Sequence, residues 1–150
     1  MRHFDNGAAL AAEIGQPIGP GEWFEITQKQ IDDYAEATGD KQWIHVDVER
    51  ARREAQGGKT IAHGYLLLGL LGKLQPTIYT VGSPRVLNVG VNKLRFLAPV
   101  PVGSNIRLVQ TVIAAEPQGD GLRVTTATEI QVEGSPKPAM AAEIIFLYFD

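Results

Sequence analysis

Hydrophobic and polar residues follow a helical spacing in the first half of the chain and a strand-like spacing in the second half. Four positions recur at helical spacing near the start: Ile31, Tyr34, Ala35 and Thr38. Thr27 precedes this run, and Gln30 stands three residues after Thr27, which is the pattern of a capping box. Gly39 stands where a left-handed C-cap is expected. The pattern predicts a helix from about Gln28 to Thr38.

The most apolar segment runs from Tyr65 to Leu74, between Gly64 and Pro76. Its leucines point nearly all round a helical wheel, which predicts a central helix buried in a core and ended by the proline. The segment is far shorter than the roughly 20 residues that a membrane helix needs. A short charged helix is expected before it, from Val48 to Gln56.

The second half contains four segments rich in valine, isoleucine and threonine, separated by glycine- and proline-containing turns: Arg85 to Ala98, Ser104 to Ala115, Leu122 to Val132 and Pro138 to Phe149. We expect hairpins between neighbouring segments to join them. The result is an antiparallel sheet packed on one buried helix, a fold of the α+β class.

Composition narrows the classes of function. A chain of 150 residues fits one domain, 1–150, in which we expect residues 1–20 to form an N-terminal extension. The net charge of −3 gives no electrostatic case for binding nucleic acid. The absence of cysteine removes disulfides, thiolate catalysis and zinc–thiolate sites. The first 15 residues lack the pattern of a signal peptide, so we expect a cytoplasmic protein that does not bind membranes.

Asp40 and His45 are the candidate chemical groups. Five residues along a regular helix would leave them about 140° apart, so they converge only if the chain turns after Gly39. An acid beside an imidazole is suited to acid/base catalysis, although the spacing alone is equally met by two solvated side chains. With Asp47 they form the only clustered metal candidates, but no known ligand spacing is matched and Asp47 fits a helix N-cap better, so we expect no metal.

Three motifs together resemble a known family. The first comprises Tyr34, Thr38-Gly39-Asp40, Ile44-His45 and Ala51, the second Ala62-His63-Gly64-Tyr65-Leu66, and the third the run from Asn92 to Gly103. They resemble the (R)-specific enoyl-CoA hydratases, also called hydratase 2 or MaoC-like dehydratases, over the chain from about Trp23 to its end. Two positions depart from the family pattern, because Gln42 replaces an asparagine and Trp43 a proline. The Gln-Trp-Ile-His form resembles the nodulation protein N-like branch.

The resemblance implies a hot-dog fold, with an antiparallel sheet wrapped around a long central helix and a first strand at Trp23 to Ile26. It also implies a homodimer that acts on acyl-CoA thioesters without a cofactor. The expected reaction adds water to trans-2-enoyl-CoA and gives (R)-3-hydroxyacyl-CoA, or runs in reverse, with Asp40 and His45 as the catalytic dyad. The departures at Gln42 and Trp43 bear on the choice of substrate.

Further site residues are expected around this dyad. The backbone N–H of Gly64 is the candidate oxyanion donor, because a residue without a side chain lets the thioester approach closely. His63 is a competing imidazole, which we expect to support the loop more than to take part in the chemistry. Gln42, Trp43, His63 and Tyr65 are the candidate pocket residues. Four cations could meet the phosphates of coenzyme A: Lys59, Lys93, Arg95 and Arg107.

Three alternatives stay open at the level of the sequence. A hot-dog thioesterase would share the fold and the ligand, but it would not need the Gly-Asp-x4-His order. A dehydratase acting on acyl carrier protein would perform the same chemistry on a larger carrier. A non-catalytic module that binds acyl thioesters is suggested by Gln42 and Trp43, although the retention of both dyad residues argues against it.

Overall fold

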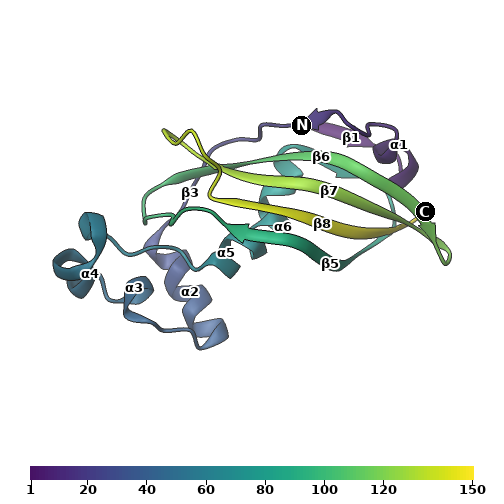
Figure 1. Cartoon of the computed structure of the whole chain (residues 1–150). Coiled ribbons are helices and arrows are strands. Elements are labelled where there is room, and N and C mark those ends of the chain that lie inside the picture. The colour runs from purple at the N-terminus through teal and green to yellow at the C-terminus, as the bar shows by residue number, and fades with distance from the viewer.

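The computed structural model describes all 150 residues and contains one large antiparallel sheet with helices on one side (Figure 1). Four long strands run side by side in the order β6-β7-β8-β5, and two short strands, β2 and β3, pair with the outer edge of β6. The strands of this sheet are β2 (Pro17–Ile18), β3 (Phe24–Glu25), β5 (Arg85–Phe96), β6 (Asn105–Gln118), β7 (Gly121–Val132) and β8 (Met140–Phe149). The predicted α+β class is confirmed, and the expected first strand at Trp23 to Ile26 corresponds to β3.

The prediction of hairpins between all neighbouring strands is wrong for β5 and β6. β5 pairs antiparallel with β8, from Arg85 opposite Phe149 to Phe96 opposite Met140. The chain between β5 and β6 therefore crosses from one edge of the sheet to the other. The edge of β6 that a hairpin partner would use is occupied by β2 and β3, which leaves β5 as the last strand of the sheet.

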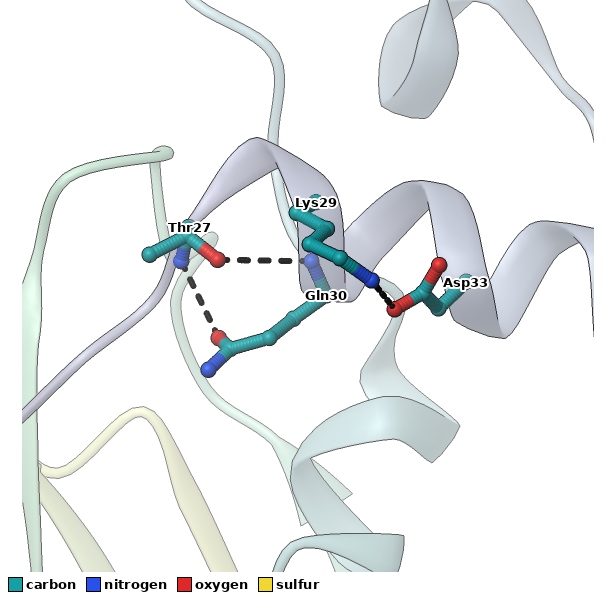
Figure 2. Close-up of polar contacts among 4 residues, drawn as sticks. All are labelled: Thr27, Lys29, Gln30 and Asp33. Carbon is teal, nitrogen blue, oxygen red and sulfur yellow. Dashed lines mark hydrogen bonds and ion pairs between the residues drawn. The ribbon is translucent and has the colours of Figure 1, made fainter.

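Helix α2 (Gln28–Thr38) begins and ends as the sequence predicts. Thr27 Oγ1 accepts a hydrogen bond from the backbone N–H of Gln30, and Gln30 Oε1 accepts one from the backbone N–H of Thr27 at 3.0 Å, so both halves of the capping box are present (Figure 2). Gly39 ends the helix with φ +79°, a left-handed conformation that favours glycine. The same figure shows the i,i+4 ion pair between Lys29 and Asp33 on the exposed side.

The central helix differs from the prediction in two respects. It consists of α5 (Gly64–Gly69), α6 (Leu71–Leu74) and a short 3₁₀ turn, η2 (Gln75–Thr77), and it is not buried all round. Tyr65 is 65% exposed, and Gly69 and Lys73 on the same segment are exposed as well. The leucines that pack against the sheet are Leu66, Leu67, Leu71 and Leu74. One side of this helix, which includes Tyr65, Gly69 and Lys73, therefore faces solvent.

The remaining elements lie at the two ends of the sheet. Residues 1–20, expected as an extension, contain β1 (Arg2–Phe4), which pairs in parallel with β4 (Tyr79–Val81), and α1 (Gly7–Ala11). Phe4 and Leu10 from this region are buried in the main core. Three short helical segments follow α2 in the chain: α3 (Trp43–Val46), α4 (Val48–Glu54) and η1 (Gln56–Gly58). None of the helices has both the length and the apolar character needed to cross a bilayer.

Candidate active site

His45 lies in the short helix α3 and is buried. Its Nδ1 lies 2.7 Å from the carbonyl oxygen of Ile61. A carbonyl oxygen can only accept, so Nδ1 carries a proton, and Nε2 of the neutral ring is then a free acceptor. The backbone of α3 is anchored from α2, because Gln28 Nε2 donates to the carbonyl of His45 at 2.8 Å. The imidazole is therefore held in one orientation with its basic nitrogen available.

Asp40 is exposed and stands in the loop directly after Gly39, the residue that ends α2. The left-handed glycine turns the chain, and the loop returns through the first turn of α3 to His45. The carboxylate of Asp40 and ring nitrogens of His45 and His63 all lie within 4.8 Å of one another. The structure thus brings together the two residues that the sequence singled out, and it adds a second imidazole.

His63 connects the parts of this cluster. Its ring is buried and stacks on the ring of His45, with centroids 3.8 Å apart, and Tyr34 packs against it with centroids 4.5 Å apart. Its Nε2 donates to the carbonyl oxygen of Asp40 at 2.9 Å, while its Nδ1 is buried without a partner. Burial, and secondarily the charge of Asp40, raise the pKa of the Tyr34 hydroxyl.

Gly64 is the first residue of α5, and its backbone N–H forms no hydrogen bond within the chain. It lines a hollow of about 310 Å³ together with His45 and a mainly apolar wall from the segment Phe96 to Val100. A Cβ at position 64 would lie 2.9 Å from the ring of Phe96. Glycine is therefore needed for the present packing of Phe96 against the start of α5. We call this space the His45 hollow.

A second hollow, of about 590 Å³, lies next to the first and shares Ile61 and Pro99 with it. Trp43 forms part of its wall, with the guanidinium of Arg50 above the indole ring at 4.1 Å, and Lys59 lies at its edge. We call it the Trp43 hollow. Trp43 therefore lies beside the His45 hollow and not within it.

The other candidate pocket residues lie outside both hollows. Gln42 is exposed, and Tyr65 is exposed with its ring edge-on to Phe96 at 5.8 Å. Among the candidate phosphate contacts, Lys93 forms an ion pair with Glu143, and Arg107 packs on Trp23 at a different hollow. The guanidinium of Arg95 donates to the neighbouring carbonyl of Leu94.

The cluster of Asp40, His45 and His63 is also the group of donor atoms that is close enough to hold a metal ion. Asp47, the third member expected from the sequence, instead caps α4 by accepting from the backbone N–H of Arg50 at 3.0 Å. The rings of the two histidines are stacked, with centroids 3.8 Å apart and planes 22° from parallel. The expectation of a metal-free site stays a prediction.

Two contacts at this site were not predicted from the sequence. The carbonyl oxygen of Ile61 orients His45, and the ring of Phe96 covers Gly64. A backbone carbonyl carries no sequence signal, because every residue has one. Phe96 lies within the third motif, so the sequence indicated that the residue belongs to a family motif, but it did not indicate that the ring contacts Gly64.

Known proteins resemble this chain over most of its length. The MaoC like domain matches residues 9–134. A 3-hydroxyacyl-thioester dehydratase Z from Mycobacterium tuberculosis is 49% identical, with 99% of each chain covered. Nodulation protein N from Rhizobium leguminosarum bv. viciae is 36% identical over 95% of this chain and 91% of its own.

Among solved structures, the unliganded R-hydratase PhaJ1 from Pseudomonas aeruginosa superposes with a TM-score of 0.75 at 25% identity, covering 92% of this chain and 83% of that chain. The hot-dog fold and the enzyme class expected from the sequence, a hydro-lyase, are confirmed. The chain belongs to the MaoC-like dehydratase family.

Proposed function

We propose that this protein is an (R)-specific enoyl-CoA hydratase, which adds water to trans-2-enoyl-CoA to give (R)-3-hydroxyacyl-CoA, or catalyses the reverse dehydration. The observation that carries the proposal is the fixed orientation of His45. Its Nδ1–H is held by the carbonyl of Ile61 at 2.7 Å, which leaves Nε2 as a free acceptor, and His45 lines the same hollow as Gly64, whose N–H is unpaired. A base and an oxyanion donor thus flank one apolar space.

In the hydration direction, a water molecule lies between Asp40 and His45. His45 Nε2 takes one proton from this water, and the resulting hydroxide forms a bond to the β-carbon of the enoyl thioester. The electron pair of the double bond moves toward the thioester carbonyl. Asp40 accepts a hydrogen bond from the same water and so holds it at the face of the substrate. The residues of the dyad act as a pair, since their donor atoms lie within 4.8 Å.

The intermediate state carries negative charge on the thioester oxygen, and the N–H of Gly64 donates to that oxygen. The proton held by the dyad then passes to the α-carbon on the same face, which completes a syn addition and regenerates neutral His45. Water and the enoyl thioester supply all the atoms and electrons of the product. The proposal therefore needs no cofactor beyond the thioester itself.

The proposed activity is tested with crotonyl-CoA and longer trans-2-enoyl-CoA substrates. Loss of the absorbance of the conjugated thioester is followed together with a free-thiol assay and chiral analysis of the product. We expect the (R)-alcohol and no thiol release. Thiol release would favour a thioesterase. Failure to hydrate CoA thioesters, with hydration of the same acyl group on acyl carrier protein, would favour the carrier-protein dehydratase.

We also propose that the protein is a homodimer joined through β5. This strand is the last one of the sheet, so its outer edge has free backbone donors and acceptors. Large apolar side chains are exposed along it and just beyond it: Val86, Leu87, Val89, Phe96 and Leu97. Light scattering on the purified protein should give twice the 16.3 kDa of one chain, and a monomeric mass would contradict this assignment.

A further inference from the structure

A thioester substrate extends from its carbonyl in two directions, an acyl chain on one side and a carrier arm on the other. The structure has two adjoining hollows that share Ile61 and Pro99, and only the His45 hollow contains the proposed base and oxyanion donor. If the proposed function holds, each arm of the substrate occupies one of the two hollows. The Trp43 hollow takes no part in the chemistry described above and is free to hold one of these arms.

The two hollows differ in polarity. Seven of the ten residues around the His45 hollow are hydrophobic, which suits the acyl chain. The Trp43 hollow combines apolar walls from Trp43, Ile44 and Ile61 with the polar or charged side chains of Glu54, Gln56 and Lys59. A carrier arm built from alternating methylene and amide groups, and ending in phosphate, matches this mixed lining.

The charges around the Trp43 hollow favour an anionic end of the ligand. Glu54 is engaged by Arg50 at 3.0 Å, and the guanidinium of Arg50 also lies over the ring of Trp43. Glu49 is paired with Arg52 at 3.0 Å. Lys59 is exposed at the edge of the hollow and forms no ion pair. The carboxylates are thus neutralised locally while one lining cation remains free.

The spacing of Lys59 and Gly64 along the chain is compatible with such an arm. Lys59 and Gly64 are five residues apart, and residues 60–62 are extended against residues 100–102 through backbone hydrogen bonds. An extended chain of that length spans at most about 17 Å, which is comparable with a stretched pantetheine arm. A thioester carbonyl at Gly64 therefore allows the phosphate end of the arm to reach Lys59.

We infer that the Trp43 hollow holds the 4′-phosphopantetheine arm of the substrate, with the arm lying along Trp43 and its phosphate paired with Lys59. This arm is common to coenzyme A and to acyl carrier protein. Trp43, which stands where the family has a proline, then lines the hollow that holds the carrier arm and does not contact the acyl chain.

The test compares one enoyl group on four carriers: coenzyme A, acyl carrier protein, pantetheine and N-acetylcysteamine. Lys59→Glu should raise KM about ten-fold for the two phosphorylated carriers, because an attraction becomes a repulsion, and leave the other two unchanged. Trp43→Ala should raise KM for the three carriers that contain pantetheine, by about five-fold or more, with kcat/KM on the N-acetylcysteamine thioester retained. Retained activity on the shortest thioester also shows that the variants are folded.

Lys137→Glu is the matched control, because Lys137 is an exposed lysine that lines a different hollow with Trp23 and Arg107. It should change no KM. Equal effects of Lys59→Glu on phosphorylated and unphosphorylated carriers, or no effect on any, would overturn the assignment. The ratio of kcat/KM for the first two carriers identifies which one the enzyme prefers.

Failure of the proposed function would be visible separately, as absence of hydration with every carrier by the parent protein. In that case calorimetric titration with coenzyme A and with pantetheine replaces turnover. Tighter binding of coenzyme A than of pantetheine, lost in Lys59→Glu, would support the assignment. Equal binding of coenzyme A by the parent and Lys59→Glu, or no binding by either, would overturn it.

Discussion

The imidazole rings of His45 and His63 are stacked, with centroids 3.8 Å apart and planes 22° from parallel. His63 also donates from Nε2 to the backbone carbonyl of Asp40 at 2.9 Å. One side chain therefore contacts both members of the proposed dyad, one through its ring and the other through a hydrogen bond. His63 is a positioning residue in this account, because its bonded nitrogen faces the protein backbone and not the substrate.

Substitution of His63 separates the two contacts. His63→Phe keeps a ring against His45 but loses the donor to Asp40, and kcat should fall about ten-fold with little change in KM, the cost of one hydrogen bond. His63→Gln places an amide nitrogen near the position of Nε2 and should restore kcat to within a few-fold of the parent. Steady-state kinetics with crotonyl-CoA measures both. Equal kcat values for the two variants would contradict the positioning role.

Substitution of Gly64 tests the close approach of the thioester. In Gly64→Ala the new methyl group would lie 2.9 Å from the Phe96 ring, so it displaces that ring and occupies the space beside the N–H. We expect kcat/KM to fall at least ten-fold. Gly69→Ala is the control on the same helix, because nothing lies within 4 Å of its added Cβ. That variant should retain full activity, and a similar loss in both would show that helix perturbation is the cause.

The capping box of α2 makes a prediction about stability. Thr27→Ala removes the acceptor for the backbone N–H of Gln30 and should lower the free energy of unfolding by about 1 kcal/mol. Thr27→Ser retains the hydroxyl and should cost much less. Urea denaturation followed by circular dichroism measures the difference. Equal losses in the two variants would mean that the methyl group of Thr27, and not its hydroxyl, stabilises the helix.

The buried hydroxyls of Tyr79 and Tyr148 should make the free energy of unfolding fall at alkaline pH. Burial raises the pKa of Tyr148 to about 12, and burial raises that of Tyr79 further, whereas an unfolded tyrosine titrates near 10. Between these values the unfolded chain loses protons that the folded chain keeps, so stability is complete below about pH 10 and declines as pH rises toward 12.

At pH 11.5, which is about 1.5 pH units above the value at which an unfolded tyrosine titrates, Tyr148→Phe should weaken this decline by about 2 kcal/mol, because each pH unit is worth about 1.4 kcal/mol. The Tyr148 hydroxyl is buried without a partner, so the substitution should change stability little at pH 7. Thermal denaturation at pH 7, 10 and 11.5 distinguishes the two effects. An unchanged pH dependence in Tyr148→Phe would assign the alkaline loss to other groups.

The features predicted correctly from the sequence are those set by neighbouring residues. The cap at Thr27 and the left-handed Gly39 fix the limits of α2, and both signals lie within a few residues of the backbone groups they satisfy. The pairing of β5 with β8 depends instead on which strands occupy the edge of β6. Periodicity within one segment contains no information about that competition, so the predicted hairpin order was wrong.

In the candidate site, too, features set by neighbouring residues were predictable and contacts between distant segments were not. The turn at Gly39 made the approach of Asp40 to His45 predictable from spacing, and the structure brings them together. The stacking of His63 on His45 depends on where α5 begins relative to α3, and the orientation of His45 depends on a backbone carbonyl at Ile61. Both are tertiary contacts between segments 16 or more residues apart, which local patterns do not encode.

The most direct test of the account is the rate of crotonyl-CoA hydration by Asp40→Asn and His45→Gln beside Asp47→Asn, a nearby carboxylate that serves only as a helix cap. Each dyad variant should lose about 10²- to 10⁴-fold in kcat, with its circular dichroism spectrum unchanged, while Asp47→Asn stays near the parent rate. Activity of either dyad variant within a few-fold of the parent would contradict the assignment of Asp40 and His45 as the catalytic pair.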